Sequence, residues 1–183
     1  MIRTILFFLL FSVPIAMASA ASPVVTEQAQ LGHNQGTIKV DVHLISPSNN
    51  DANAKYIIKI FRNGQNTPMQ EIDAFAEIDK PWIELVDLNG DGYVDILFNN
   101  IHAGFGSGPT IGADVFMYIP KIKKFVMSKT LTGRGQIEKA SVNNCVNVLY
   151  KSSMMGYTGE TWCFIQAKGI WKMDSSQRNE PDE

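Results

Sequence analysis

The sequence predicts an all-β fold, either a sandwich or a small propeller-like array of short antiparallel strands. Apolar and polar residues alternate in many short runs, and clusters of Gly, Pro, Asn and Asp separate these runs. No stretch has the periodicity of an amphipathic helix of four or more turns. No internal repeat is found either, so the sequence does not support a multi-bladed repeat array.

Alternation with a period of two is clearest over residues 37–45, where a strand with one buried face is expected. Residues 131–137 are expected to be a connection. A long loop is expected over residues 99–112, because four glycines and one proline fall there. Loops of this length are uncommon in compact domains and often functional. The other strands are expected over residues 55–61, 69–75, 82–86, 93–98, 114–119, 124–127, 144–151, 160–167 and 170–173.

The first twenty residues have the features of a secretory signal peptide. A positive charge at Arg3 precedes an apolar run over residues 4–16, and Ala18 and Ala20 form a small-residue cleavage site. The apolar run is too short for a transmembrane anchor, and no cysteine lies near the cleavage site to carry a lipid. We therefore expect cleavage after Ala20 and a mature chain without a membrane anchor, located in the periplasm or, as the alternative, secreted.

The rest of the chain is expected to contain one β domain over residues 37–173. A flexible lead-in over residues 21–36 and a polar, disordered tail over residues 174–183 are expected to flank this domain. The formal net charge of the whole chain is −2. This mild acidity argues against a nucleic acid as the partner.

Residues 87–95 read Asp-Leu-Asn-Gly-Asp-Gly-Tyr-Val-Asp and predict a calcium-binding loop between two strands. Oxygen-bearing side chains stand at loop positions 1, 3, 5 and 9, and the backbone carbonyl at position 7 adds a further ligand. Gly92 at position 6 permits the sharp turn. Three carboxylates this close repel one another unless a cation lies among them. The predicted Ca²⁺ ligands are Asp87, Asn89, Asp91, Tyr93 and Asp95.

This loop does not match an EF-hand. An EF-hand requires a bidentate glutamate at position 12, where this chain has Phe98, and two flanking helices. The flanking residues 82–86 and 93–98 are instead rich in β-branched and aromatic side chains, which are typical of strands. A polar Asn-Gly-Asp-Gly turn without a metal remains the alternative interpretation.

The chain has two cysteines, Cys145 and Cys163. In an exported protein a disulfide between them is expected, rather than two buried free thiols. If the cysteines face each other across an antiparallel hairpin, opposed residues have a constant sum of residue numbers. Lys151 would then face Tyr157, and the hairpin tip would lie near Met154. The bridge would join the two strands at the base of this hairpin.

The sequence has no recognisable catalytic motif, and we expect that the protein is not an enzyme. It has no G-x-S-x-G, no H-E-x-x-H and no cysteine in a redox or His-paired motif. A glycosidase-like pair of carboxylates could still form in space, although surface carboxylates are the far commoner explanation. The candidates for such a pair are Glu71, Asp73, Glu77 and Glu84.

Residues 81–97 resemble a family of exported bacterial calcium-binding β proteins, whose signature is D-x-N-x-D-G-Y-x-D between two strands. In that family a Gly/Asn-rich loop follows, and then a strand that contains a tyrosine and turns before a phenylalanine. Tyr118 and Phe125 match these two positions. The resemblance continues weakly to about residue 173. The chain departs from the family at Gly90, where a bulky residue is usual, and in its cysteine pair.

The characterised members of this family are periplasmic immunity proteins, which inhibit a lysozyme-like effector delivered by a type IV secretion system. The resemblance implies a non-catalytic inhibitor whose partner is a secreted peptidoglycan hydrolase. Such an inhibitor needs rigid loops that present aromatic anchors. The candidate contacts are Tyr157 in the hairpin tip, and His102 and Phe105 in the Gly-rich loop.

A second hypothesis is a calcium-stabilised module that binds a glycan or an adhesion partner. It arises because the same calcium pattern occurs in integrin-like and dockerin-like modules, so the pattern specifies a metal better than a function. A neighbouring gene for a secreted peptidoglycan hydrolase would favour the inhibitor.

Overall fold

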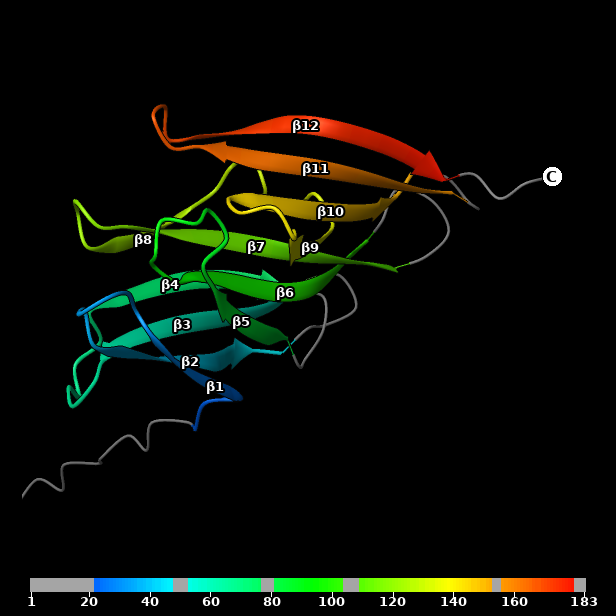
Figure 1. Cartoon of the computed structure of the whole chain (residues 1–183). Helices are drawn as coiled ribbons and strands as arrows, with labels where there is room; N and C mark the ends of the chain where they lie inside the picture. Colours follow the sequence, from blue (N-terminus) through cyan, green and yellow to red (C-terminus); the bar gives the residue numbers. More distant parts are fainter. Residues whose placement is uncertain (1–21, 48–52, 77–80, 104–108, 153–155, 180–183) are drawn as a thin grey trace, which may run out of the picture.

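The computed structural model describes residues 22–47, 53–76, 81–103, 109–152 and 156–179. Twelve strands form three four-stranded antiparallel sheets, and the described residues contain no helix. Each third of the chain forms one sheet. The three sheets are stacked as layers, and the sheet from the middle of the chain lies between the other two (Figure 1). The prediction of an all-β, sandwich-like fold is confirmed.

The first sheet comprises β1 (Val25–Gln30), β2 (Thr37–Ser46), β3 (Ala54–Arg62) and β4 (Gln70–Ala76). The expectation of a flexible lead-in over residues 21–36 is wrong, because β1 pairs with β2 along its whole length, from Val25 opposite Val42 to Gln30 opposite Thr37. β1 is mostly exposed and polar. Its position depends on backbone hydrogen bonds to β2. Such bonds do not require apolar residues that alternate along the sequence, so the sequence gives no signal for this strand.

The central sheet comprises β5 (Trp82–Val86), β6 (Asp95–Ala103), β7 (Pro109–Ile119) and β8 (Lys124–Met127). The expected loop over residues 99–112 is wrong for most of its length, because β6 and β7 extend into it and pair as far as Ala103 opposite Pro109. Pro109 is tolerated as the first residue of its strand, where no ladder hydrogen bond from its nitrogen is needed. Residues 104–108 lie outside the described part of the chain.

The third sheet comprises β9 (Gln136–Lys139), β10 (Cys145–Lys151), β11 (Tyr157–Ile165) and β12 (Ile170–Asn179). Two expectations are corrected here. The connection expected over residues 131–137 contains the start of β9, which pairs with β10. The disordered tail expected from residue 174 is a strand as far as Asn179, because β12 continues to pair with β11 after a bulge at Thr161 and Trp162.

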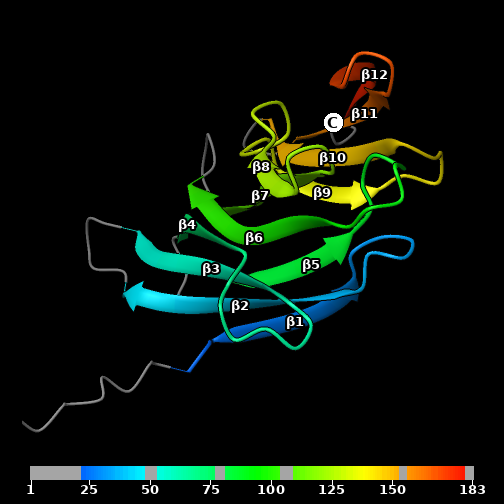
Figure 2. The same ribbon diagram turned by 90° about the vertical axis from the view of Figure 1, so that its left-hand side faces the viewer.

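The central sheet is buried on both faces. One core lies between it and the first sheet, and a second core lies between it and the third sheet (Figure 2). Because side chains alternate along a strand, neighbouring residues of β6 and β7 enter different cores. The first core receives Ile96, Phe98, Phe116 and Tyr118. The second core receives Leu97, Val115 and Met117.

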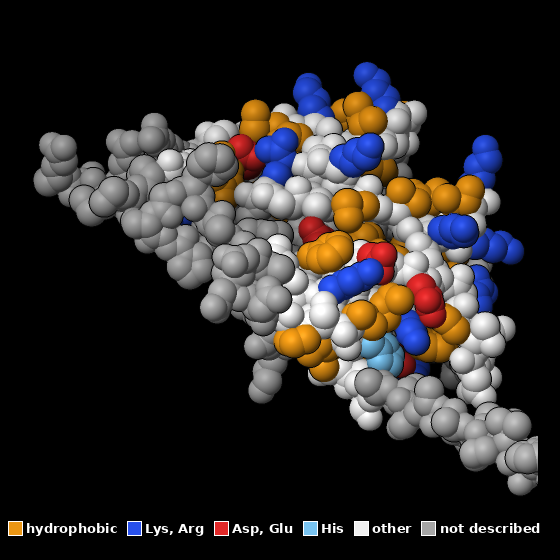
Figure 3. All heavy atoms as spheres, turned by 180° about the vertical axis from the view of Figure 1, so that it is seen from behind, with side chains coloured by type: hydrophobic (Ala, Val, Ile, Leu, Met, Phe, Trp, Pro, Cys, Tyr) orange, Lys and Arg blue, Asp and Glu red, His pale blue; other side chains and the backbone are white. Residues whose placement is uncertain are grey.

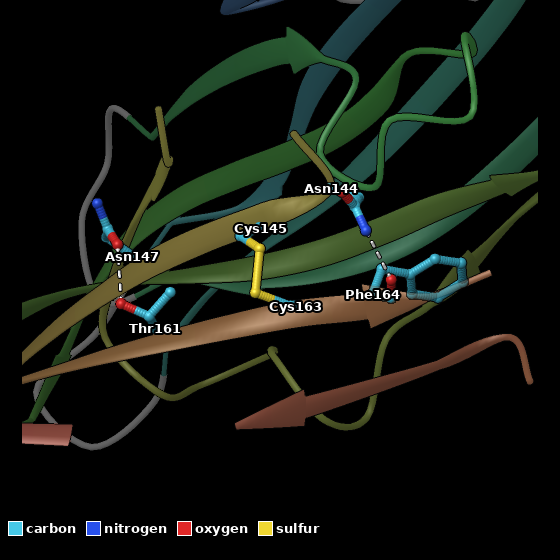
Figure 4. The surroundings of a disulfide bond; sticks show 6 residues. All are labelled: Asn144, Cys145, Asn147, Thr161, Cys163 and Phe164. Carbon is cyan, nitrogen blue, oxygen red and sulfur yellow. Dashed lines mark hydrogen bonds between the residues drawn. A yellow bond between two sulfur atoms is a disulfide. The ribbon is translucent and has the colours of Figure 1, made fainter. Parts of the chain in front are cut away.

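The predicted disulfide is present, and the predicted register of its hairpin is confirmed. Cys145 faces Cys163 across β10 and β11, and Lys151 faces Tyr157. Figure 4 shows the bridge between the two strands, with a hydrogen bond between Asn144 and Phe164 on one side of it. The predicted tip at Met154 lies outside the described residues. The bridge therefore covalently joins the two central strands of the third sheet.

Removal of this bridge should destabilise the protein. The ring that it closes spans 18 residues of sequence separation, and the chain-entropy model then gives a loss of about 3 kcal/mol in the free energy of unfolding. We expect this loss for the double variant Cys145→Ser/Cys163→Ser in urea denaturation. Equal stability of variant and parent would contradict the prediction, and labelling of native protein with a thiol reagent should find no free thiol.

Candidate metal centre and partner surfaces

The predicted calcium loop connects β5 to β6. Its first residue, Asp87, folds the loop around its own carboxylate, which accepts hydrogen bonds from the backbone N–H groups of Gly90 at 2.8 Å and Gly92 at 3.0 Å. Both glycines have positive φ, 72° and 84°. This conformation costs glycine nothing and strains other residues. The local sequence therefore produces a tight turn around a carboxylate.

Asn89 and Asp91 are joined to each other inside this turn. The Asn89 amide donates to an Asp91 carboxylate oxygen at 3.0 Å, and the Asp91 backbone N–H donates to the Asn89 amide oxygen at 3.0 Å. The other Asp91 oxygen accepts from the backbone N–H of Tyr93 at 2.9 Å. The side-chain oxygens at loop positions 3 and 5 are thus held next to each other.

Asp95, the last predicted ligand, is fully buried at the start of β6. Its carboxylate accepts hydrogen bonds from the backbone N–H groups of Tyr118 at 2.9 Å and Leu88 at 3.1 Å. Burial is the largest cause that raises the pKa of Asp95 to about 7; the two hydrogen bonds lower this pKa, and the charges of Asp91 and Asp87 raise it further. The negative charges of Asp91 and Asp87 thus act on the buried carboxyl group of Asp95 and make its ionisation less favourable.

The loop fits a divalent cation in its charge and its donors. None of the ion pairs in the described part of the chain involves Asp87, Asp91 or Asp95, so three carboxylates share one turn without a basic side chain beside them. Each carboxylate has about four lone-pair sites and uses about two for hydrogen bonds within the protein, which leaves capacity for a metal. Carboxylate, amide and backbone oxygens are the ligands that Ca²⁺ prefers.

However, the side chains of this loop are not arranged as a ready metal-binding group. Among the described residues, no three Asp, Glu, His or Cys side chains form a group close enough to hold a metal ion together. The Asp91 carboxylate and the Asn89 amide are instead bonded to each other. Calcium binding at Asp87, Asn89, Asp91, Tyr93 and Asp95 therefore stays a prediction.

The loop contacts all three sheets. On the side of the first sheet, the Val94 N–H donates to the Leu31 carbonyl at 2.9 Å, and Tyr93 forms a β-bridge with Gly32. On the side of the third sheet, the Gln166 amide donates to the Asn89 carbonyl at 2.9 Å. The loop therefore lies at one end of the central sheet, in contact with residues of both neighbouring layers.

Gly90 and Leu88 allow the calcium loop to pack closely against the third sheet and the second core. A Cβ atom at Gly90 would lie 3.2 Å from the backbone nitrogen of Asn144, so a side chain there would press against the chain just before β10. Leu88 is fully buried in the second core. Sequence spacing alone does not show these contacts, because Asn144 lies more than fifty positions from Gly90 and Leu88 packs among residues of other strands.

Two of the three predicted partner contacts, Tyr157 and the backbone of His102, lie at the opposite end of the molecule. β10 begins at Cys145, directly after Asn144, which lies beside the calcium loop, and it ends at Lys151, which faces Tyr157. β6 likewise begins at the loop and runs to His102, whose backbone pairs with Thr110. β6 and β10 therefore run in the same direction. Both start at the end of the molecule that holds the calcium loop (the loop end, on the left of Figure 1) and finish at the opposite end (the tip end, on the right).

Of the three predicted contact residues, Tyr157 is the best described. Its side chain is 49% exposed, and its backbone is held between Lys151 of β10 and Asn179 of β12. His102 belongs to β6 instead of a loop, and Phe105 lies outside the described residues. The structure thus brings Tyr157 and the position of His102 to one end of the stack.

The carboxylates considered for a glycosidase-like pair have other partners. Asp73 and Glu71 are paired with Lys55 at 3.5 Å and Lys59 at 4.0 Å along β3 and β4. The Glu84 carboxylate accepts from the Asn99 amide at 2.9 Å. The fourth candidate, Glu77, lies outside the described part of the chain. These contacts fit the surface-carboxylate interpretation for Glu71 and Asp73.

Comparisons with known proteins found a likeness at the level of the fold. No family model matches the chain, and no curated protein matches it. No helix in the described part of the chain is long and apolar enough to cross a membrane. Among solved structures, the chain is similar to one described as "Structure of a Xanthomonas Type IV Secretion System related protein", with 14% identity and a TM-score of 0.53. The match covers 85% of this chain and 82% of that one, so the two share an all-β fold over most of their lengths.

Proposed function

We propose that the protein is an exported, calcium-binding inhibitor of a secreted peptidoglycan hydrolase and acts as a periplasmic immunity protein. The observation that carries this proposal is the likeness in fold, over 85% of the chain, to a protein related to a type IV secretion system. It agrees with the resemblance of residues 81–97 to periplasmic inhibitors of effectors that such systems deliver. The sequence resemblance and the fold likeness thus both support a link to proteins related to type IV secretion.

Export is supported by the cysteine pair. A structural disulfide such as Cys145–Cys163 persists in oxidising compartments such as the periplasm and is rare in the cytosol. The signal-peptide features of residues 1–20 predict the same compartment. The hydrolase substrate, peptidoglycan, lies in that compartment, and an inhibitor there would meet an incoming hydrolase.

The proposed mechanism assigns separate roles to the two ends of the molecule. At the loop end, Asp87, Asn89, Asp91, Tyr93 and Asp95 would hold the ion, which supplies the positive charge that this turn lacks. The loop contacts all three sheets, so binding there would hold the layers together. At the tip end, the β10–β11 connection would enter the cleft of the hydrolase. There the protein acts by obstruction and needs no catalytic group of its own.

Replacement of Tyr157 tests the role of the tip end. An aromatic anchor at the centre of an interface typically contributes about 2 kcal/mol or more, which corresponds to roughly thirtyfold in Kd. We expect Tyr157→Ala to weaken inhibition by about that factor, measured as the clearance of a peptidoglycan suspension by the hydrolase. His102→Ala should also weaken inhibition. Because Tyr157 is half exposed, its replacement should change the melting temperature little.

Phe75→Ala is the matched control. Phe75 is an aromatic residue of similar exposure, 51%, on β4 of the first sheet, and its loss should leave inhibition unchanged. Equal inhibition by Tyr157→Ala and the parent would remove the tip end from the proposal. Binding to peptidoglycan without any effect on hydrolases would favour the alternative, a calcium-stabilised glycan-binding or adhesion module.

A further inference from the structure

A pocket of about 240 Å³ opens at the loop end, between the β7–β8 hairpin and the β11–β12 hairpin. Asn89 of the calcium loop forms part of its wall, and most of the remaining wall is apolar. Four large apolar side chains of the wall are each more than a third exposed: Ile119, Val126, Met127 and Ile170. We call this feature the hairpin pocket. Its size suits a single inserted side chain rather than a whole small domain.

Trp171 in the wall of the hairpin pocket has an unpaired hydrogen-bond donor. Its side chain is only 8% exposed, and its indole Nε1 is buried without a partner among the described residues. The other two indoles are satisfied, since Trp82 donates to Glu84 and Trp162 donates to Glu160. Buried donors in folded proteins are nearly always paired. The unpaired indole of Trp171 therefore reports directly on whatever occupies the pocket beside it.

The two hairpins around the pocket carry only basic charges. No Asp or Glu occurs over residues 115–137 or 161–173, although the chain as a whole has 18 acidic and 16 basic residues. Figure 3 shows Lys and Arg side chains standing beside hydrophobic ones along the right-hand edge of the molecule. Six exposed lysines of these hairpins make no ion pair with a described residue: Lys121, Lys123, Lys124, Lys129, Lys168 and Lys172.

We propose that the hairpin pocket binds an acidic segment of a partner protein, which inserts one apolar side chain between the two hairpins. The lysines attract the acidic residues of the segment, and the inserted side chain lies against Trp171 in the pocket wall. The pocket favours a protein segment over a membrane surface, because its volume of about 240 Å³ suits one inserted side chain.

This surface is separate from the proposed inhibitory tip. On β11, Tyr157 lies seven residues before Phe164, which lines the hairpin pocket, so the two sites are about 23 Å apart at the usual rise per residue. The inference therefore does not depend on the proposed inhibition. A second partner could occupy the pocket while the tip remains free.

The test uses nuclear magnetic resonance of ¹⁵N-labelled full-length protein and a panel of synthetic hexapeptides. Each peptide carries Glu or Asp at both ends around a central apolar pair, such as Leu-Phe, Val-Tyr or Ile-Met. We expect the Trp171 indole resonance to shift on titration, while those of Trp82 and Trp162 stay in place. Peptides with Lys in place of the acidic residues should not bind.

Four variants localise the binding. Ile170→Asp and the double variant Lys124→Glu/Lys172→Glu should each weaken binding by about tenfold or more. Ile45→Asp and Lys151→Glu are the matched controls, because Ile45 is an exposed isoleucine of the first sheet and Lys151 lies at the tip end; both should leave binding unchanged. The proposal is overturned if no acidic peptide shifts Trp171, if the lysine peptides bind equally well, or if the protein binds vesicles of anionic phospholipid but none of the peptides.

Discussion

Calcium at a thousandfold excess over its Kd should stabilise the protein by about 4 kcal/mol relative to the chelated form. For a chain of this size, that corresponds to a rise of roughly 8–16 °C in the melting temperature. The effect should be global because the loop bonds to the first sheet through Val94 and to the third sheet through Asn89. Thermal unfolding with calcium and with chelator measures it.

Asp91→Ala separates metal binding from a general effect of the chelator. The variant loses a carboxylate at the centre of the loop and should show almost no difference between calcium and chelator. Asp73→Ala is the matched control, because Asp73 is an exposed aspartate of β4 whose ion pair lies away from the loop. It should keep the full calcium response. A melting temperature that chelator leaves unchanged in the parent protein would contradict the calcium site.

The pH dependence of the chelated protein should follow from Asp95. The pKa of its carboxyl group is raised from 3.8 to about 7 in the fold, with burial as the largest cause. The folded state therefore holds a proton that the unfolded state releases, so the chelated protein should lose stability as the pH rises from about 4 to about 7. Calcium should remove this loss by stabilising the ionised carboxylate.

Leu88→Ala should destabilise the protein by about 2–5 kcal/mol, the usual range for a leucine removed from a packed core. Leu88 belongs to the calcium loop by sequence, yet its side chain is fully buried in the second core. The substitution leaves every predicted calcium ligand in place. We therefore expect lower stability in urea denaturation, but a calcium response that remains.

Leu149→Ala provides the comparison for this variant. Leu149 lies in β10 of the third sheet and is 44% exposed, so its loss should change the free energy of unfolding by less than about 0.5 kcal/mol. Similar losses for the two leucines would show that Leu88 does not anchor the loop to the core. Loss of the calcium response in Leu88→Ala would show that the loop needs this anchor to bind the ion.

The strands that the sequence predicts best are those with one buried face. Residues 37–45 alternate clearly and form β2, and residues 124–127 form β8 with the predicted bounds. The disulfide register was also predictable, because two cysteines that face each other determine every other pair of that hairpin. In these cases a local pattern contains the information, and the structure confirms it.

The strands that the sequence misses depend on partners far along the chain. β1 and the end of β12 are polar, and each is held mainly by its neighbouring strand. The extended hairpin of β6 and β7 crosses residues rich in glycine, where local propensity favours a loop although pairing continues. Edge pairing and long hairpins are tertiary effects that residue patterns alone do not encode.

The same distinction between local patterns and long-range contacts applies to the candidate sites. The oxygen spacing of residues 87–95 is visible in the sequence, whereas the contacts of the loop with Leu31, Asn144 and Gln166 are not. Residue patterns alone do not locate the hairpin pocket, because its two walls come from different sheets. One signal for it is present in the sequence, namely two hairpins with several lysines and no acidic residue.

The most direct test of the proposed inhibition is a titration of hydrolase activity. The mature protein is added in steps to a fixed concentration of a secreted peptidoglycan hydrolase, ideally one encoded next to it, and the clearance of a peptidoglycan suspension is followed in calcium. We expect clearance to fall in proportion to the added protein and to stop near equimolar amounts, while the protein alone clears nothing. Unchanged clearance at a large excess of the protein, or clearance of peptidoglycan by the protein alone, would contradict the proposal.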